Sequence, residues 1–335
     1  MGWKGTMRTL AAVQARSQRE SVRRQNELQR QMNHSSKLQE EQQAEYEYQL
    51  YENYVDILSS IHKDCGNIWN WNEISTSEPP IKPDKSSENE RKAQAEYDAY
   101  KPSISDKLLK KVVGKQAELV KAIEEGRNKD EEEYQNALKQ YEQDNMEWEN
   151  TCKLASKVLS GDVEAYMEAI KQIQPFKEIT QLGSQLNIRA EDSRIIEATL
   201  QVKGEDVIPG EVKSLTKSGK LSVKKISTTK FYELYQDYVC GAVIRVAREL
   251  FALLPVELAI VTAVGGVLNP ATGHIDEQPI LSAAMPRETI DKLNFEMLDP
   301  SDSLVNFVHN IRFQKAKGFS PVEKILPSRF LESKN

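Results

Sequence analysis

The feature that most constrains this chain is a change in its hydrophobic pattern near residue 190. Before that point the sequence is polar, contains blocks of like charge and carries the apolar spacing of exposed helices. After it, every second residue is apolar over a short stretch, which is typical of half-buried strands, and longer apolar runs follow. The 335 residues also exceed the usual size of one domain. We therefore expect an α+β fold, with a helical, partly coiled-coil N-terminal region followed by a globular C-terminal domain.

The expected organisation has four parts. Residues 1–66 form a long charged helix or arm, 67–87 a loop with tryptophans and prolines, 88–183 a helical hairpin or coiled-coil region, and 190–335 an α+β globular domain. The loop is expected because prolines and Gly66 interrupt the helical pattern, and its tryptophans are expected to anchor it to the body of the protein.

The first part divides by charge. Basic residues dominate residues 4–37, whereas residues 38–61 contain acidic residues and no basic one. The basic half has few apolar positions, so we expect residues 1–40 to be an arm that joins a partner or another copy of the chain. An apolar stripe at helical spacing predicts a docked helix over residues 45–62. The candidate binding residues of the arm are Arg16, Arg19, Arg23 and Arg24.

The third part contains an apolar row with alternating steps of four and three from Tyr134 to Leu159, with the polar Asn145 inside it. Such a row is typical of a helix that packs against another helix, and a buried asparagine fixes the register of some coiled coils. The sequence predicts a turn at residues 126–128 and a partner helix over residues 109–123. Pairing within one chain and pairing between chains both remain open.

The fourth part predicts a mixed sheet with a long helix across one face. The expected strands are 196–202, 207–215, 221–226, 256–264 and 275–285, and the long helix is 231–254. Thr228 or Thr229 is expected to cap that helix, a short helix is expected after Pro286, and another over residues 300–311. The strand 256–264 is apolar on both faces, so it is expected to be central.

One motif suggests chemistry. Glu211 and Lys213 lie two residues apart in a predicted strand, and therefore on one face of it, while Asp206 or Glu197 could add a second carboxylate. This Glu-x-Lys motif and the order β-β-β-α-β resemble the core of nucleases of the restriction-endonuclease type. The resemblance implies that carboxylates hold Mg²⁺ and that the lysine supports the attacking water. A charge pair on a solvated strand face accounts for the motif equally well.

A second cluster suggests binding. Six lysines surround the predicted hairpin, opposed only by Glu211: Lys213, Lys217, Lys220, Lys224, Lys225 and Lys230. The first five are candidate binding residues for an anionic ligand, and nucleic acid is a possible partner. The alternative is a solvated strand edge that lysines protect from aggregation.

The remaining features narrow the class of protein. The net charge of −6 provides no general field for nucleic acid, and the histidines and three cysteines are too scattered for a zinc site. No apolar run is long enough to cross a bilayer, and we expect a cytoplasmic protein without a metal or cofactor. We expect a non-enzymatic assembly or scaffold protein, with helices for partner or self-association and an α+β domain for recognition. The alternative is a Mg²⁺-dependent nuclease or an inactive relative of one.

Overall fold

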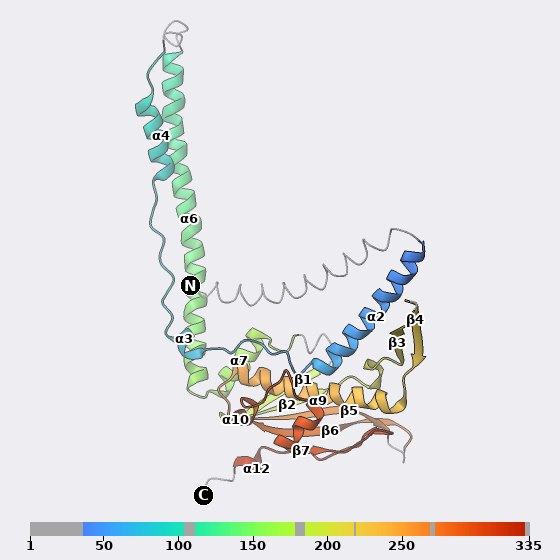
Figure 1. The fold of residues 1–335 in the computed structure, drawn as a ribbon. Coiled ribbons are helices and arrows are strands. Elements are labelled where there is room, and N and C mark those ends of the chain that lie inside the picture. Colours follow the sequence, from blue (N-terminus) through green and yellow to red (C-terminus); the bar gives the residue numbers. More distant parts are fainter. Residues whose placement is uncertain (1–35, 104–110, 178–184, 218, 269–271, 332–335) are drawn as a thin grey trace. The chain divides into compact units, whose positions relative to one another are not determined.

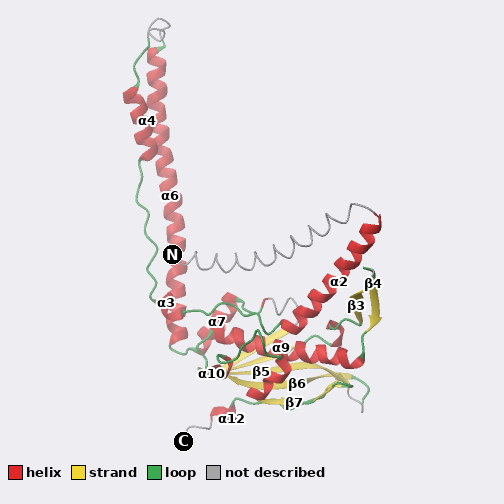
Figure 2. Ribbon diagram, in the orientation of Figure 1, coloured by secondary structure: helices red, strands yellow, loops and turns green. Residues whose placement is uncertain are grey.

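The computed structural model describes residues 36–103, 111–177, 185–217, 219–268 and 272–331. The described residues form two compact units. The helical unit comprises residues 73–153, and the α+β unit comprises residues 36–72 together with 154–331. The α+β fold class expected from the sequence is confirmed (Figures 1 and 2). The basic arm, including Arg16, Arg19, Arg23 and Arg24, lies outside the described residues apart from its last few positions.

The α+β unit is built on a five-stranded mixed sheet with the strand order β1-β2-β5-β6-β7. Only β2 and β5 run parallel, and the other neighbours are antiparallel. The strands are β1 (Gln185–Asp192), β2 (Ile195–Gln201), β5 (Leu258–Leu268), β6 (Ile275–Pro286) and β7 (Val308–Ile311). As predicted, β2 alternates between buried and half-buried residues, and β5 is central and buried from Leu258 to Ala263.

Helix α9 (Thr228–Leu253) covers one face of this sheet (Figure 1). On the opposite face Ile195, Leu258, Ile260 and Ala284 pack with Ile325, which belongs to the C-terminal segment. The amide of Ile325 donates to Ser282 Oγ (3.0 Å), which also lies 2.9 Å from Thr262 Oγ1. Both faces of the central strand are therefore covered, as its apolar pattern requires.

Four details of this unit differ from the sequence-based prediction. The hairpin β3 (Glu211–Leu215) and β4 (Leu221–Lys225) is a separate two-stranded sheet that packs against helix α2 (Ser36–Ser60) and has no ladder to the main sheet. Strand β1 was not predicted, and Ser227 rather than a threonine caps α9. Residues 300–311 form α11 (Pro300–Ser303), the 3₁₀ turn η2 (Leu304–Asn306) and then β7, not one helix.

Smaller elements complete this unit. They are α7 (Val163–Ile173), η1 (Glu205–Val207), α10 (Arg287–Ile290), β8 (Phe313–Gln314), β9 (Gly318–Phe319) and α12 (Ser328–Leu331). Asp162 caps α7 by accepting hydrogen bonds from the amides of Glu164 and Ala165.

The C-terminal end of α2 docks against α9, as predicted for residues 45–62. Leu58 and Ile61 are buried, and a Cβ added at Gly241 of α9 would lie 2.6 Å from Ile61 Cγ2. The glycine therefore permits the close approach of the two segments. The tryptophans behave as expected, because the Trp69 amide donates to Ala252 O (2.8 Å) and Trp71 Nε1 donates to Leu253 O (2.5 Å). These bonds join residues 69–71 to the end of α9.

A buried ion pair on α9 fixes the position of the segment that follows α2. Arg245 Nε lies 2.7 Å from Glu249 Oε1 on α9, and both side chains are buried. The Glu249 carboxylate also accepts a hydrogen bond from the Gly66 amide, at 3.0 and 3.1 Å to its two oxygens. Glu249, which lies among the polar positions of the predicted helix, is therefore part of the interior.

The helical unit contains one long helix rather than two. Helix α6 (Val112–Leu159) has 48 residues, which corresponds to about 72 Å. The predicted turn at residues 126–128 is wrong, and residues 112–123 of the predicted partner helix are the first part of α6 itself. Helix α4 (Glu88–Ala99) lies beside α6 instead (Figure 1). The short α3 (Trp71–Ser75) precedes this unit.

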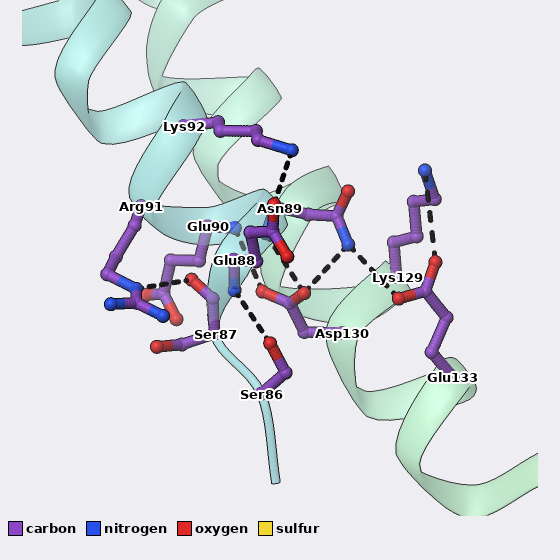
Figure 3. A network of polar contacts seen from close by, with 10 residues as sticks. All are labelled: Ser86, Ser87, Glu88, Asn89, Glu90, Arg91, Lys92, Lys129, Asp130 and Glu133. Atoms are coloured by element: carbon purple, nitrogen blue, oxygen red, sulfur yellow. Dashed lines mark hydrogen bonds and ion pairs between the residues drawn. The ribbon is translucent and has the colours of Figure 1, made fainter. Parts of the chain in front are cut away.

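The N-terminus of α4 lies against α6 at Asp130 (Figure 3). The Asp130 carboxylate accepts hydrogen bonds from the amides of Asn89 (3.0 Å) and Glu90 (2.9 Å), so it caps α4 from another helix while Ser87 makes no side-chain cap. A Cβ at Gly126 would lie 2.8 Å from Asn89 O. The glycine that resembles a turn signal is therefore needed for close packing.

The apolar row of α6 is partly covered by residues 74–85, which comprise the end of the short helix α3 and the segment after it. Trp148 Nε1 donates to Ser77 O (3.2 Å) and to Ser77 Oγ (3.0 Å). Cys152 Sγ donates to Ile74 O (3.4 Å), and Lys85 pairs with Glu131 (2.5 Å). Tyr134, Leu138, Tyr141 and Trp148 are only half-buried, and Leu159 is 39% exposed. The row is therefore not buried against the helix predicted before residue 126 of the same chain, and the Asn145 amide group donates a hydrogen bond to the exposed Glu149.

Candidate recognition surface

The β3–β4 hairpin forms with the turn predicted between its strands. Glu211 faces Lys225 and Lys213 faces Val223 across the ladder. The Thr216 amide donates to Lys220 O (2.9 Å), and Gly219 adopts a φ of +74°, which favours glycine. The turn therefore places Lys217 and Lys220 at one end of the hairpin, while Lys224 and Lys225 lie at the other.

Lys213 differs from the other lysines of this cluster. Its Nζ lies 3.2 Å from Glu47 Oε2 of α2, and both side chains are about one-third exposed. Hydrogen bonds from Gln43 and from Lys213 hold the pKa of Glu47 below its usual value. The charge of Lys213 is thus neutralised by a residue that no sequence motif connects to it, and the pair ties the hairpin to α2.

The other five lysines of the hairpin region point to solvent. Lys217, Lys220, Lys224, Lys225 and Lys230 are all exposed, and no ion pair to them occurs within the described part of the chain. Glu211 is opposite Lys225 in the ladder and is the only acidic residue between positions 211 and 230. The surface therefore carries a local excess of positive charge on a protein of negative net charge.

An open apolar pocket of about 320 Å³ lies between α2 and the segment that leads into β3. Its walls include Leu50, Tyr51, Tyr54, Val207 and Pro209, and Lys213 lies at its margin. Tyr54 OH donates to Val207 O (2.7 Å), which holds the two walls together. Tyr51 OH is buried without a hydrogen-bond partner among the described residues, and burial raises the pKa of this phenol.

One face of α2 remains exposed above this pocket. Leu50, Tyr54 and Ile57 are 40%, 38% and 41% exposed, although they follow the four-and-three spacing of a buried helical face. The sequence assigned Leu50 and Tyr54 to the docked stripe, and the structure shows that only Leu58 and Ile61 at its end are fully buried. The apolar spacing of α2 identifies this face, but spacing alone does not show how much of the helix packs against the rest of the unit.

The structure separates the residues of the nuclease alternative. Asp206 lies in η1 and lines the pocket with Lys213, whereas Glu211 is exposed on β3 and Glu197 lies on β2 of the main sheet. In register, Glu197 lies between Arg189 of β1 and Ile260 of β5. No group of three or more histidine, cysteine or acidic side chains among the described residues is arranged to hold a metal ion.

On the described surface, exposed ammonium groups, a strand edge and an apolar pocket lie on adjacent elements. Within the described ranges, no helix is both long and apolar enough to span a membrane. Comparison of the chain with protein-family models, with curated proteins and with solved structures finds no match.

Proposed function

We propose that this protein is a non-enzymatic assembly protein, in which the helical unit joins copies of the chain and the α+β unit recognises a further partner. The observation that carries the first half is an uncovered apolar stripe on α6. Val113 is 78% exposed, Val120 is 53% exposed, and Ala117 between them is also exposed. Their steps of four and three place them on one helix face.

Such a stripe is the contact face of a helix pair. Burial of an exposed valine side chain stabilises an interface by about 1–2 kcal/mol. A second copy offers the same stripe, so a symmetric contact needs no other component. The flanking Lys121–Glu125 ion pair (3.2 Å) supplies charges of both signs that a paired helix could share. A contact of this size predicts weak, concentration-dependent association.

Charge placed in the stripe tests this half of the proposal. Val113→Glu with Val120→Glu should raise the dissociation constant of the dimer about tenfold or more, because carboxylates would have to be desolvated at the contact. Sedimentation equilibrium over a concentration series measures this constant. Lys115→Glu is the matched control, since it changes the net charge equally at an exposed position on the other side of the helix.

The control should associate like the natural sequence, and circular dichroism should show equal helix content in all three proteins. A natural chain that stays monomeric up to about 1 mM, the weak end of specific association, would contradict the proposal. So would equal association of the stripe variant and the control.

A further inference from the structure

From the hairpin we infer that the partner of the α+β unit is an acidic peptide segment in extended conformation, which adds to β4 as a third strand. This inference rests on the proposed function only in giving the α+β unit a recognition role. It depends on three observations: the free edge of β4, the charge around it, and the residue types that the hairpin contains.

The backbone of β4 has unpaired groups at regular positions. The Thr216 amide donates a hydrogen bond to Lys220 O at one end of the ladder, and the Ile226 amide donates one to Gly210 O (3.0 Å) at the other. Hydrogen-bonded and non-hydrogen-bonded residue pairs alternate along an antiparallel ladder. The backbone groups of Ser222 and Lys224 therefore form hydrogen bonds with β3. The amides and carbonyls of Leu221, Val223 and Lys225 therefore point away from β3. No described strand pairs with this edge.

The charge around the edge selects the partner. Lys224 and Lys225 lie on β4, and Lys217 and Lys220 lie at its turn, all exposed. These side chains repel the same hairpin of another copy, so edge-to-edge pairing of two copies is disfavoured. An incoming strand that carries carboxylates meets the opposite sign at each of these positions. The lysines thus protect the edge against self-pairing and at the same time favour an acidic strand.

The residue types favour a peptide over a nucleic acid. Positions 211–230 contain no aromatic residue and no arginine, the side chains on which bases usually stack. Val223 on β4 is 45% exposed, and it offers an apolar contact that a phosphate backbone does not use. Backbone pairing along an edge with alternate side-chain contacts is the recognition mode of strand addition.

The direct test is fluorescence polarisation with a labelled peptide of about eight residues that alternates glutamate and valine, long enough for one strand. The full chain should bind it saturably, and added salt should weaken the binding. Lys224→Glu with Lys225→Glu should weaken binding about tenfold or more, because the two attractive charges become repulsive. Lys171→Glu with Lys324→Glu makes the same charge change at exposed positions on other elements and should leave the affinity unchanged.

A backbone variant separates strand addition from charge attraction. Val223→Pro removes an amide that points away from β3, so the hairpin ladder keeps its own bonds while the peptide loses one of its partners. This variant should lose about tenfold in affinity, whereas Val223→Thr, which keeps the amide, should lose about twofold at most. Hydrogen exchange of the Lys224 amide, bonded within the ladder, checks that the hairpin of each variant is folded.

Three outcomes would overturn the inference. One is no saturable binding of the peptide by the natural chain. Another is equal affinity of the Val223→Pro and Val223→Thr proteins with an intact ladder. The third is binding of a labelled single-stranded oligonucleotide more tightly than the peptide, which would identify a phosphate-binding patch. None of these bears on association through α6, so the two proposals fail independently.

Discussion

The longest helices of the two units differ in what they bury. Helix α9 of the α+β unit is buried at nearly every position from Leu234 to Leu253, between the sheet on one side and the end of α2 on the other. The part of α6 that belongs to the helical unit has only two buried residues, Gly126 and Asp130, along its described length. Helix α9 is therefore part of the hydrophobic core, whereas most of the surface of α6 is exposed to solvent. This contrast is why we place association on α6.

The polar contacts of the two units differ in the same way. In the α+β unit the Arg245–Glu249 pair is buried and hydrogen-bonded to the backbone of Gly66. The ion pairs formed within α6 are exposed and join residues four apart, such as Lys121–Glu125 and Lys153–Glu149. Exposed pairs of this kind contribute a few tenths of a kcal/mol each, whereas breaking a buried pair costs several. Equal substitutions should therefore have very unequal effects in the two units.

Glu249→Ala should have the largest effect. It leaves the Arg245 guanidinium buried without its main partner and frees the Gly66 amide, so we expect a loss of about 3–5 kcal/mol in the free energy of unfolding. Urea denaturation measures this loss. Glu142→Ala on the exposed surface of α6 is the comparison and should cost less than about 0.5 kcal/mol. Similar losses at the two positions would remove the contrast between the units.

Asp237→Asn should stabilise the α+β unit in a pH-dependent manner. Burial, followed by the nearby Asp299 carboxylate, raises the pKa of Asp237 from 3.8 to about 6. A carboxyl group with a raised pKa in the folded state favours folding when protonated, so its contribution is lost as pH rises from about 4 to about 6. Because Asp237 is partly exposed and solvent screens its charge, the variant should gain about 1–2 kcal/mol over the natural chain at pH 8 and much less at pH 4.

Thermal unfolding of both proteins across this pH range provides the measurement. An equal effect of Asp237→Asn at every pH would mean that its ionisation is not linked to folding. The substitution would then act through packing alone.

A pair of glycines in α6 gives the smallest but most local prediction. Gly126→Ala would place a Cβ against the backbone of Asn89 and Glu90, so α4 should detach from α6. A Cβ added at Gly114 would meet no other part of the protein within 4 Å, so Gly114→Ala should only strengthen the helix, by about 0.5–1 kcal/mol. Limited proteolysis within residues 88–99 should become faster in the first variant only. Equal cleavage would show that α4 does not depend on this contact.

The sequence predicted those parts of the fold in which the spacing of apolar residues directly indicates which side chains are buried. The alternation of β2, the two-sided apolar run of β5 and the broad apolar face of α9 all have the expected partners. It did not predict Gly126, because a glycine at a helix crossing and a glycine in a turn look alike in a single sequence. Nor did it predict the burial of Glu249, whose charge is satisfied by Arg245 four residues earlier and by Gly66 far along the chain.

The candidate surface was predictable to the same degree. The lysines cluster within one short segment, so composition alone identifies them. The pairing of Lys213 with Glu47 joins positions 166 residues apart, and no local pattern encodes such a contact. The edge of β4 is free because the hairpin is separate from the main sheet. The position of the hairpin in the sequence had predicted that it would be part of that sheet.

Hydrogen–deuterium exchange of the full chain at a low and a high protein concentration tests the central claim, that α6 is an association surface and the α+β unit an independent folded body. At the higher concentration, amides of α6 near Val113 and Val120 should exchange more slowly, because pairing of the stripe suppresses local opening. Amides of β5 and α9 should exchange equally at both concentrations. Unchanged exchange near Val113 and Val120, or slower exchange confined to β5 and α9, would contradict the account.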